Sequence, residues 1–520
     1  MRYENPVIPG FHPDPSICRV GEDFYLVTSS FEYFPGVPVF HSRDLVHWRQ
    51  IGHCLTRRSQ LELEGVAASH GIFAPTIRYH DGLFYMTTTN VTRGGNFIVT
   101  ATDPAGEWSD PVWVDQPGID PSLFFDDDGK VYYTTSSDGI KQSEIDVRTG
   151  AFLAEPRIVW AGTGGAYPEG PHLYKKDGWY YLVISEGGTE LGHMITTASS
   201  RHPHGPYESF AGNPILSHRS LPSPIKSTGH ADIVQDADGR WWTVCLATRP
   251  VGYPFKHHLG RETFLVPTTW EEGGWPVVGS NGTLEAVMEA ELPGTAHLSE
   301  SAGTPAGVAF SREADRPAFD DFDHPAPALC WNFLRNPHAE DWSLGENPGS
   351  LTLHGSAATL GDEASPAFLG RRLEHFVVTC ETALSFSPAS DGEEAGLTVL
   401  MNNRFHYEIA LKRIAGQVCV VFRRTLGSLS REDVVAPFAG GTVRLSVETD
   451  GIWFNFRYAD ESGSTLPAGR GECGLLSTEV AGGFTGVYVG LYATGNGRRC
   501  DAPALFDSFS YAPAQDQTIR

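Results

Sequence analysis

Short runs in which apolar and polar residues alternate fill most of the chain, and turns rich in Gly, Asp and Pro separate them. Alternation with a period of two is typical of β-strands with one buried face, whereas an amphipathic helix needs a period near 3.6. The pattern therefore predicts an all-β protein.

The first three hundred residues repeat one pattern five times. Each copy has a small or acidic start, an apolar strand, a turn with Gly or Asp, and an aromatic pair that opens a second strand. The copies lie at 14–25, 74–85, 120–133, 170–181 and 231–242. Asp-Gly between apolar runs supplies the positive φ that tight β-hairpins need. The spacing leaves room for four strands per copy, which predicts a five-bladed β-propeller.

The repeat fades past about residue 295, where periodic apolar residues become sparse. From Phe319 onward alternating segments return, for example at 405–411 and 484–492, without helical patterns between them. Strands at this spacing predict a β-sandwich of the jelly-roll or concanavalin-like type. We predict a propeller over 1–298, a linker over 299–316 and a sandwich over 317–514.

Composition and charge narrow the class of partner. The formal net charge of −25 argues against nucleic acid and anionic membranes, since both attract basic patches. No apolar run approaches the length of a membrane span, and the start of the chain shows no signal-peptide pattern. The eight cysteines form no C-x-x-C pair, which predicts reduced, mostly buried thiols rather than a metal or redox motif. The expectation is a cytoplasmic protein.

Three of the five repeats place a carboxylate at or beside the same position. These residues are Asp14, Asp120 and Glu169. The first strand of each propeller blade is innermost, so its start faces the shared central mouth. Hydrolysis of a glycosidic bond needs one protonated and one ionised carboxyl group, and a third carboxylate helps the acid keep its proton. The repeat thus predicts a glycosidase site.

Simpler interpretations exist for each residue taken alone. Asp-Pro-Ser is a common turn opener, in which Asp caps backbone N–H groups. His230 is equally well explained as a histidine satisfied within the core. The aromatic pairs are expected to pack between blades. The shared position across blades favours the joint hypothesis over these alternatives.

Several ordered motifs resemble one known family. They lie at 5–16, 31–37, 42–48, 118–122, 167–172, 229–232 and 260–264. In this order they resemble glycoside hydrolase family 43, in the branch of β-xylosidases and α-L-arabinofuranosidases with an appended C-terminal β-sandwich. The resemblance covers essentially the whole chain.

The resemblance implies an inverting mechanism. Asp14 would be the general base, Glu169 the general acid, and Asp120 would orient Glu169 and keep it protonated. Further residues would bind the substrate. Phe31 and Phe73 would form apolar walls, Arg261 would donate hydrogen bonds to sugar hydroxyls, and Ala74 and Thr189 would complete the pocket. The sandwich would narrow this pocket and favour cleavage from the non-reducing end.

The resemblance also bears on cofactors and on the choice of sugar. A His at the position of His230 often stands beside a hydrated Ca²⁺ in the family. One imidazole with waters is a weak site, so we predict no required cofactor and an optional Ca²⁺. Many relatives have Trp where this chain has Phe73, which bears on the choice between β-xylosides and α-L-arabinofuranosides.

The predicted activity is exo-acting release of D-xylose from β-1,4-xylo-oligosaccharides, with α-L-arabinofuranosidase activity as a second capability. The alternatives are an α-L-arabinofuranosidase acting on arabinoxylan fragments and, from another class, a non-catalytic carbohydrate-binding propeller. Assembly into a homo-oligomer is left open.

Overall fold

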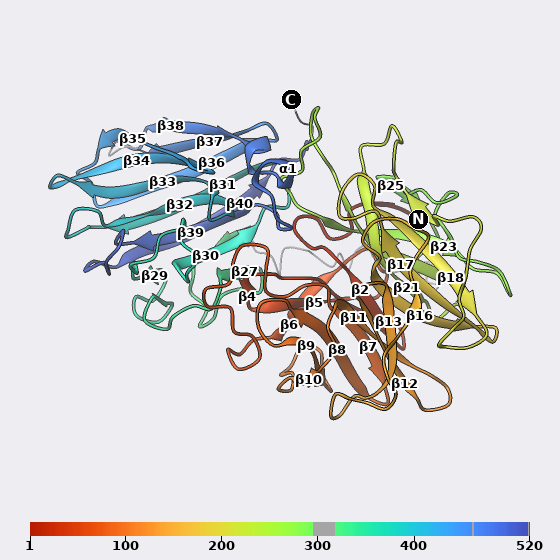
Figure 1. Ribbon diagram of the computed structural model, residues 1–520. Coiled ribbons are helices and arrows are strands. Elements are labelled where there is room, and N and C mark those ends of the chain that lie inside the picture. Colours follow the sequence, from red (N-terminus) through yellow and green to blue (C-terminus); the bar gives the residue numbers. More distant parts are fainter. Residues whose placement is uncertain (295–317, 460–461, 518, 520) are drawn as a thin grey trace, which may run out of the picture.

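The computed structural model describes residues 1–294, 318–459, 462–517 and 519. Two all-β domains lie side by side, a propeller coloured red to green and a sandwich coloured green to blue (Figure 1). They confirm the predicted fold, a five-bladed β-propeller followed by a concanavalin-like sandwich. The predicted linker, 299–316, lies outside the described residues, so the domain boundaries stay a prediction.

Each propeller blade is an antiparallel sheet whose strands run outward in chain order. Blade one contains β2 (Ser16–Val20), β3 (Asp23–Val27), β5 (Gly36–Ser42) and β6 (Arg49–Leu55). Blade two contains β7 (Thr76–His80), β8 (Leu83–Asn90), β9 (Gly95–Ala101) and β10 (Val112–Val114). Blade three contains β11 (Ile119–Phe125), β12 (Val131–Ser136), β13 (Ile140–Asp146), β14 (Ala151–Phe152) and β15 (Arg157–Trp160).

The last two blades follow the same plan. Blade four contains β16 (Glu169–Lys176), β17 (Trp179–Glu186), β18 (Met194–Ser200), β19 (Glu208–Ser209) and β20 (Leu216–Ser217). Blade five contains β21 (Lys226–Gln235), β22 (Trp241–Thr248), β23 (Glu262–Thr269) and β24 (Val277–Val278). The first strands contact one another in a closed ring, β2 to β7, β11, β16, β21 and back to β2. These five strands therefore surround the propeller axis.

The Asp-Gly turns fold the first hairpin of most blades. Asp81 and Gly82 have φ of 49° and 81°, and Asp177 and Gly178 have φ of 53° and 73°. Two residues with positive φ define the tight turn whose twist matches that of antiparallel strands. The repeat was visible in the sequence because this backbone conformation restricts the residue types that can occupy it.

The start of the chain closes the ring. β1 (Arg2–Glu4) pairs with β25 (Val287–Glu289), which follows the fifth blade. The Asn5 side chain donates to the Leu265 carbonyl at 3.0 Å, and its own carbonyl accepts from the Leu265 N–H at 2.9 Å. These contacts join the first residues to β23 and fix the geometry of the mouth.

The sandwich consists of two eight-stranded sheets. One contains β26 (Phe319–Asp320), β28 (Trp342–Ser343), β29 (Leu351–Leu353), β31 (Val377–Phe386), β36 (Thr442–Asp450), β37 (Trp453–Ala459), β38 (Thr465–Glu472) and β40 (Ala504–Pro513). The other contains β27 (Trp331–Leu334), β30 (Ala367–Arg372), β32 (Glu394–Asn402), β33 (Phe405–Ile414), β34 (Gln417–Leu426), β35 (Leu429–Pro437), β39 (Tyr488–Thr494) and, from the propeller, β4 (Tyr33–Phe34).

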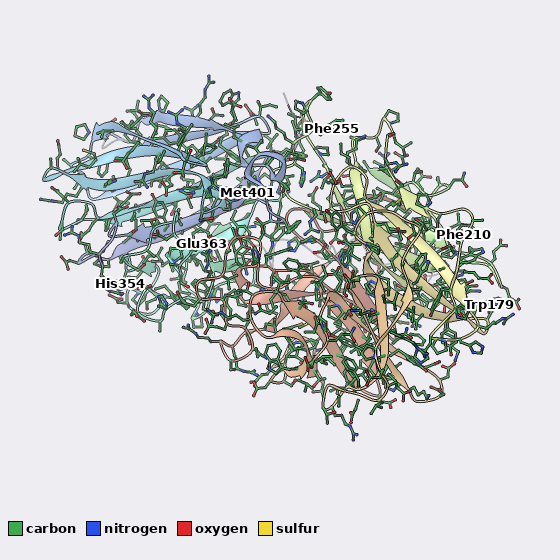
Figure 2. The ribbon with its side chains drawn as sticks, viewed as in Figure 1. Trp179, Phe210, Phe255, His354, Glu363 and Met401 are labelled. Atoms are coloured by element: carbon green, nitrogen blue, oxygen red, sulfur yellow. The ribbon has the colours of Figure 1, made fainter. Side chains whose placement is uncertain are left out.

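Apolar side chains fill the space between these two sheets, with Met401 fully buried among them (Figure 2). Two short helices, η2 (Cys473–Leu476) and α1 (Thr478–Ala481), precede β39. No helix in the described part of the chain has the length and apolarity needed to cross a membrane. All eight cysteines are free and buried, as their scattered positions predict.

The two domains share a sheet and a core. β4 pairs with β27, so a propeller strand extends a sandwich sheet. The Tyr33 and Tyr488 rings stack with centroids 3.9 Å apart, and Arg372 donates to the Phe11 carbonyl at 2.7 Å. Packing of this kind fixes the sandwich loop at 482–486 beside the propeller mouth.

Candidate active site

The carboxylates are positioned by unusual backbone at the start of the inner strands. Asp14 and Asp120 have φ of 56° and 54°, a left-handed conformation that few residues other than Gly, Asn and Asp adopt. The pairing register shifts between Ile119 and Ser122, and again between Glu169 and His172. Such bulges re-aim side chains, and here they turn the carboxyl groups into one pocket.

Asp14 is buried beside a cation. Arg261 donates to it from Nη1 at 2.6 Å, Ser29 Oγ donates at 2.5 Å, and His230 Nδ1 lies 3.7 Å away. Burial alone would raise the pKa of Asp14, but the Arg261 charge, with His230 and the Ser29 hydroxyl, outweighs burial and lowers this pKa. Asp14 is therefore ionised at neutral pH.

Asp120 has the opposite electrostatic environment. Burial, together with the negative charges of Glu169 and Asp14, raises the pKa of Asp120 well above its ordinary value. Two weaker influences oppose this effect: the Gly170 N–H, which donates to Asp120 Oδ2 at 3.2 Å, and the positive charge of Arg261. The site thus places a carboxyl group with a lowered pKa, Asp14, near one with a raised pKa, Asp120.

A side chain at Gly170 would be strained in its backbone and crowded by His230. The φ of Gly170 is 57°, and a Cβ at this position would lie 3.0 Å from His230 Nε2. The Glu-Gly pair that begins β16 therefore brings Glu169 into the pocket while its neighbour packs directly against His230.

Glu169 contacts a residue that the sequence did not single out. His193 Nε2 lies 3.0 Å from Glu169 Oε1, and the His193 side chain has no exposed surface. The Glu169 side chain is 16% exposed and that of Asp14 is 5% exposed, while Asp120 is a buried residue. Of the three carboxyl groups, Glu169 is the most accessible to a bound molecule.

Three phenylalanines from separate segments form the apolar walls. The Phe31 ring centroid lies 5.3 Å from that of Phe73 and 6.1 Å from that of Phe484. Phe484 comes from the sandwich and is held there because its N–H donates to Ser69 Oγ at 2.8 Å. The cavity measures about 100 Å³, and Ala74, Ile119 and Thr189 complete its lining.

His230 is part of this lining and is buried. Burial lowers the pKa of its imidazole, although Asp14 and Glu169 act in the opposite direction. In the described residues no group of three or more His, Cys, Asp or Glu side chains is arranged to hold a metal ion. The side chains present do not form a Ca²⁺ site by themselves, and no catalytic step below uses one; the optional ion stays a prediction.

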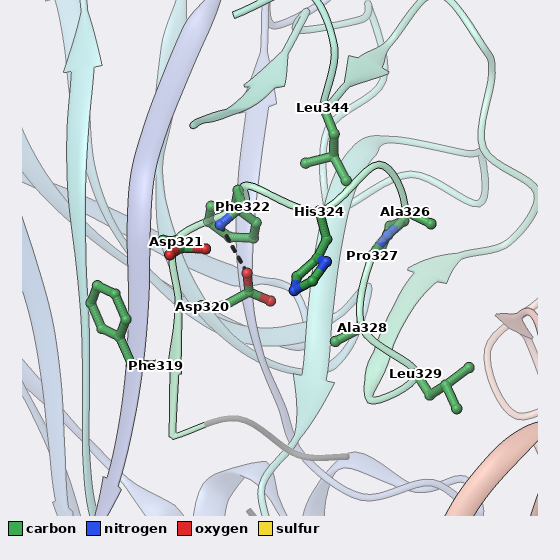
Figure 3. A pocket seen from close by; sticks show the side chains of 10 residues that line it. All are labelled: Phe319, Asp320, Asp321, Phe322, His324, Ala326, Pro327, Ala328, Leu329 and Leu344. Atoms are coloured by element: carbon green, nitrogen blue, oxygen red, sulfur yellow. Dashed lines mark hydrogen bonds between the residues drawn. The ribbon is translucent and has the colours of Figure 1, made fainter. Parts of the chain in front are cut away.

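A larger cavity, of about 500 Å³, lies in the sandwich between Phe319 and Leu344 (Figure 3). Asp320 accepts from the Phe322 N–H at 2.9 Å and from the Trp331 indole at 2.8 Å, and Asp321 accepts from the Asp323 N–H at 3.2 Å. The described residues that line this cavity include neither a third carboxylate nor an arginine, so the chemistry is assigned to the propeller mouth.

All residues proposed from the sequence for the site line this one pocket: Asp14, Phe31, Phe73, Ala74, Asp120, Glu169, Thr189, His230 and Arg261. Sequence reasoning missed Ser29, His193 and Phe484. The two glycines before Phe484 mark a special loop, but nothing in the sequence shows that it reaches the other domain. Arg261 contacts Asp14 directly, a pairing that the sequence did not predict.

Three carboxyl groups in one pocket at the mouth of a five-bladed propeller, two of them with pKa values shifted in opposite directions, form the kind of site that hydrolysis of a glycosidic bond needs. Family comparison agrees: residues 3–276 match the model of glycosyl hydrolases family 43, and residues 319–512 match that of the β-xylosidase C-terminal concanavalin A-like domain. The chain belongs to glycoside hydrolase family 43 and is a glycoside hydrolase.

Similar proteins span the whole chain. A non-reducing end α-L-arabinofuranosidase of Bacteroides ovatus is 43% identical, over 98% of this chain and 94% of its own length. A xylosidase/arabinosidase of Butyrivibrio fibrisolvens is 40% identical, over 96% of each chain. The solved structure of a xylan β-1,4-xylosidase from Bacillus halodurans superposes with a TM-score of 0.89 at 32% identity, covering 98% of this chain and 100% of that one.

Arg261→Gln is expected to move the acidic limb of the pH–activity profile to higher pH. The Arg261 cation holds the pKa of Asp14 down, and the role predicted for Asp14, a general base, requires the ionised form, so loss of the cation lets Asp14 take up a proton at higher pH. Loss of a hydrogen bond to a charged group, about 1.5–3 kcal/mol, corresponds to a roughly 10- to 100-fold fall in kcat/KM. Kinetics between pH 4 and 9 measure both effects.

The matched control is Arg148→Gln, which removes an exposed arginine paired only with Asp146 on the surface. It should leave the profile unchanged. An unmoved acidic limb in Arg261→Gln would show that Asp14 is not the group that must be ionised.

Proposed function

We propose that the enzyme removes the terminal D-xylose from the non-reducing end of β-1,4-xylo-oligosaccharides, with inversion at the anomeric carbon, and that the same pocket accepts α-L-arabinofuranosides. The observation that carries this proposal is the pocket itself. It is small, it is walled on one side by Phe484 of the sandwich, and it holds two carboxyl groups, Asp14 and Asp120, whose pKa values are shifted in opposite directions. Such a pocket suits one sugar ring at a chain end.

Asp14 acts as the general base. It takes a proton from a water molecule, and the resulting hydroxide attacks the anomeric carbon from the face opposite the leaving oxygen. Direct attack by Asp14 is disfavoured because Arg261 and Ser29 both bind its oxygens. For a water to fit, the Asp14 and Glu169 carboxyl groups should stand about 6.5–9.5 Å apart when substrate is bound.

Glu169 acts as the general acid. Burial, together with the negative charges of Glu169 and Asp14, raises the pKa of Asp120, so a second proton-holding carboxyl group lies in the same pocket as Glu169. Delivery to the glycosidic oxygen falls to Glu169, because it is the more exposed member of the pair. Asp120 accepts a hydrogen bond from the Gly170 N–H and so orients the backbone that carries Glu169.

Two observations support activity on α-L-arabinofuranosides as well. Phe73 has a smaller ring than the Trp that the family resemblance leads one to expect at this position, which leaves more room beside the sugar. Relatives with more than 39% identity are named for arabinofuranosidase or for both activities. The two pentoses present similar hydroxyl patterns, so one set of hydrogen-bonding groups can serve both.

Nitrophenyl β-D-xylopyranoside and nitrophenyl α-L-arabinofuranoside should both be hydrolysed, and Phe73→Trp should raise the ratio of their kcat/KM values in favour of the xyloside by about 5-fold or more. The larger ring fills the space that a furanoside uses, and one misfitted methylene group corresponds to about 1–3 kcal/mol. Steady-state kinetics of both variants measure the ratio. An unchanged ratio would remove Phe73 from the determinants of sugar choice.

A further inference from the structure

The general acid has one direct side-chain partner outside the carboxylate cluster. His193 Nε2 is 3.0 Å from Glu169 Oε1, and the described residues offer Glu169 Oε2 no hydrogen bond from the protein. One oxygen of Glu169 is therefore held by the imidazole, and the other is left for a bound molecule.

The His193 imidazole is tightly packed by its neighbours. Gly229 packs under it so tightly that a Cβ there would lie 2.2 Å from His193 Nδ1. The His193 N–H donates to the Glu190 carbonyl at 3.0 Å, which closes the loop at 187–193. Thr189, in the same loop, lines the pocket. The position of this ring is thus tied to the pocket wall.

The two ring nitrogens differ in a way that fixes the tautomer. His193 Nδ1 is buried and, in the described residues, has no hydrogen-bond partner. A proton on Nδ1 would leave a buried donor unsatisfied, whereas a proton on Nε2 can be donated to Glu169 and leaves only an acceptor unpaired. Buried donors without partners are the rarer arrangement, so the neutral ring carries its proton on Nε2.

From this geometry we propose that His193 is a positioning residue for the general acid, an inference that rests on the function proposed above. The Nε2–H donates to Glu169 Oε1 and so keeps the acidic proton of Glu169 on Oε2, the oxygen open to the leaving group. When Oε2 gives up that proton, the same hydrogen bond stabilises the carboxylate that forms. Both effects assist protonation of the leaving oxygen and not activation of water by Asp14.

The test compares substrates with poor and good leaving groups, and variants of His193 with and without an N–H donor. His193→Leu should lower kcat on xylobiose, whose leaving sugar needs a proton, by about 10- to 100-fold. It should lower kcat on nitrophenyl β-D-xylopyranoside, whose leaving group needs little protonation, by less than about 3-fold. His193→Gln places an amide N–H at the same number of bonds from the backbone as Nε2, and should restore xylobiose turnover to within about 5-fold of wild type.

Inhibition by D-xylose reports on the integrity of the pocket, and its constant should stay within about 2-fold in every variant. If His193→Leu does not fold, His193→Asn replaces it, because its amide ends one bond short of the Glu169 carboxyl. Equal losses on both substrates, or no rescue by Gln, would overturn the inference. Failure of the wild-type protein to hydrolyse either substrate would instead overturn the proposed function.

Discussion

Asp14→Asn is expected to abolish turnover of xylobiose and of nitrophenyl β-D-xylopyranoside alike, with kcat about 10³-fold or more below wild type. The reason is that water must be deprotonated whatever group leaves, and an amide cannot accept that proton. Asn keeps the shape of Asp14 and its contact with Ser29, so the pocket stays filled. Steady-state kinetics on both substrates, with thermal unfolding to confirm a folded protein, provide the measurement.

Asp128→Asn is the matched control. It removes one negative charge from an exposed turn of blade three, far along β11–β12 from the mouth, and should leave kcat unchanged. Substantial activity of Asp14→Asn on either substrate would show that another group activates the water.

Glu169→Ala is expected to lower kcat much more on xylobiose than on nitrophenyl β-D-xylopyranoside. Xylobiose should lose about 10³-fold in kcat, because the departing sugar oxygen needs a proton as its bond breaks. The nitrophenyl glycoside should lose only about 10-fold, since nitrophenolate leaves with little protonation. The ratio between the two losses measures the part of catalysis that Glu169 supplies as an acid.

Glu208→Ala, on the outer strand β19 of the same blade, is the control for loss of a carboxylate and should behave as wild type. Losses of the same size on both substrates for Glu169→Ala would mean that a different residue is the acid.

The sequence predicted the blades because tight turns constrain residue type. The Asp-Gly pairs at 81–82 and 177–178 adopt the positive φ that made them recognisable. The same reasoning located Asp14 and Asp120, since both occupy the start of an inner strand in a conformation that few residues tolerate. Repetition across blades turned ambiguous dipeptides into a predicted site.

Contacts between distant segments could not be predicted in this way. Phe484 enters the pocket from the second domain through a hydrogen bond to Ser69, a pairing 415 residues apart in the chain. The electrostatic roles also depend on three-dimensional burial. The proton-retaining character of Asp120 follows from its burial beside Glu169 and Asp14, and Asp14 stays ionised because of Arg261. The spacing of residues along the sequence does not predict which of these side chains lie close together in the folded protein.

The stereochemistry of the first product tests the central claim most directly, because it distinguishes water activation by Asp14 from attack by Asp14 on the sugar. Proton NMR spectra recorded in the first minutes of xylobiose hydrolysis, before the sugar equilibrates, identify the anomer of the released xylose. With Asp14 as the general base, the β-linkage should yield α-D-xylose first. Initial release of β-D-xylose would contradict the account and would make Asp14 the nucleophile of a retaining enzyme.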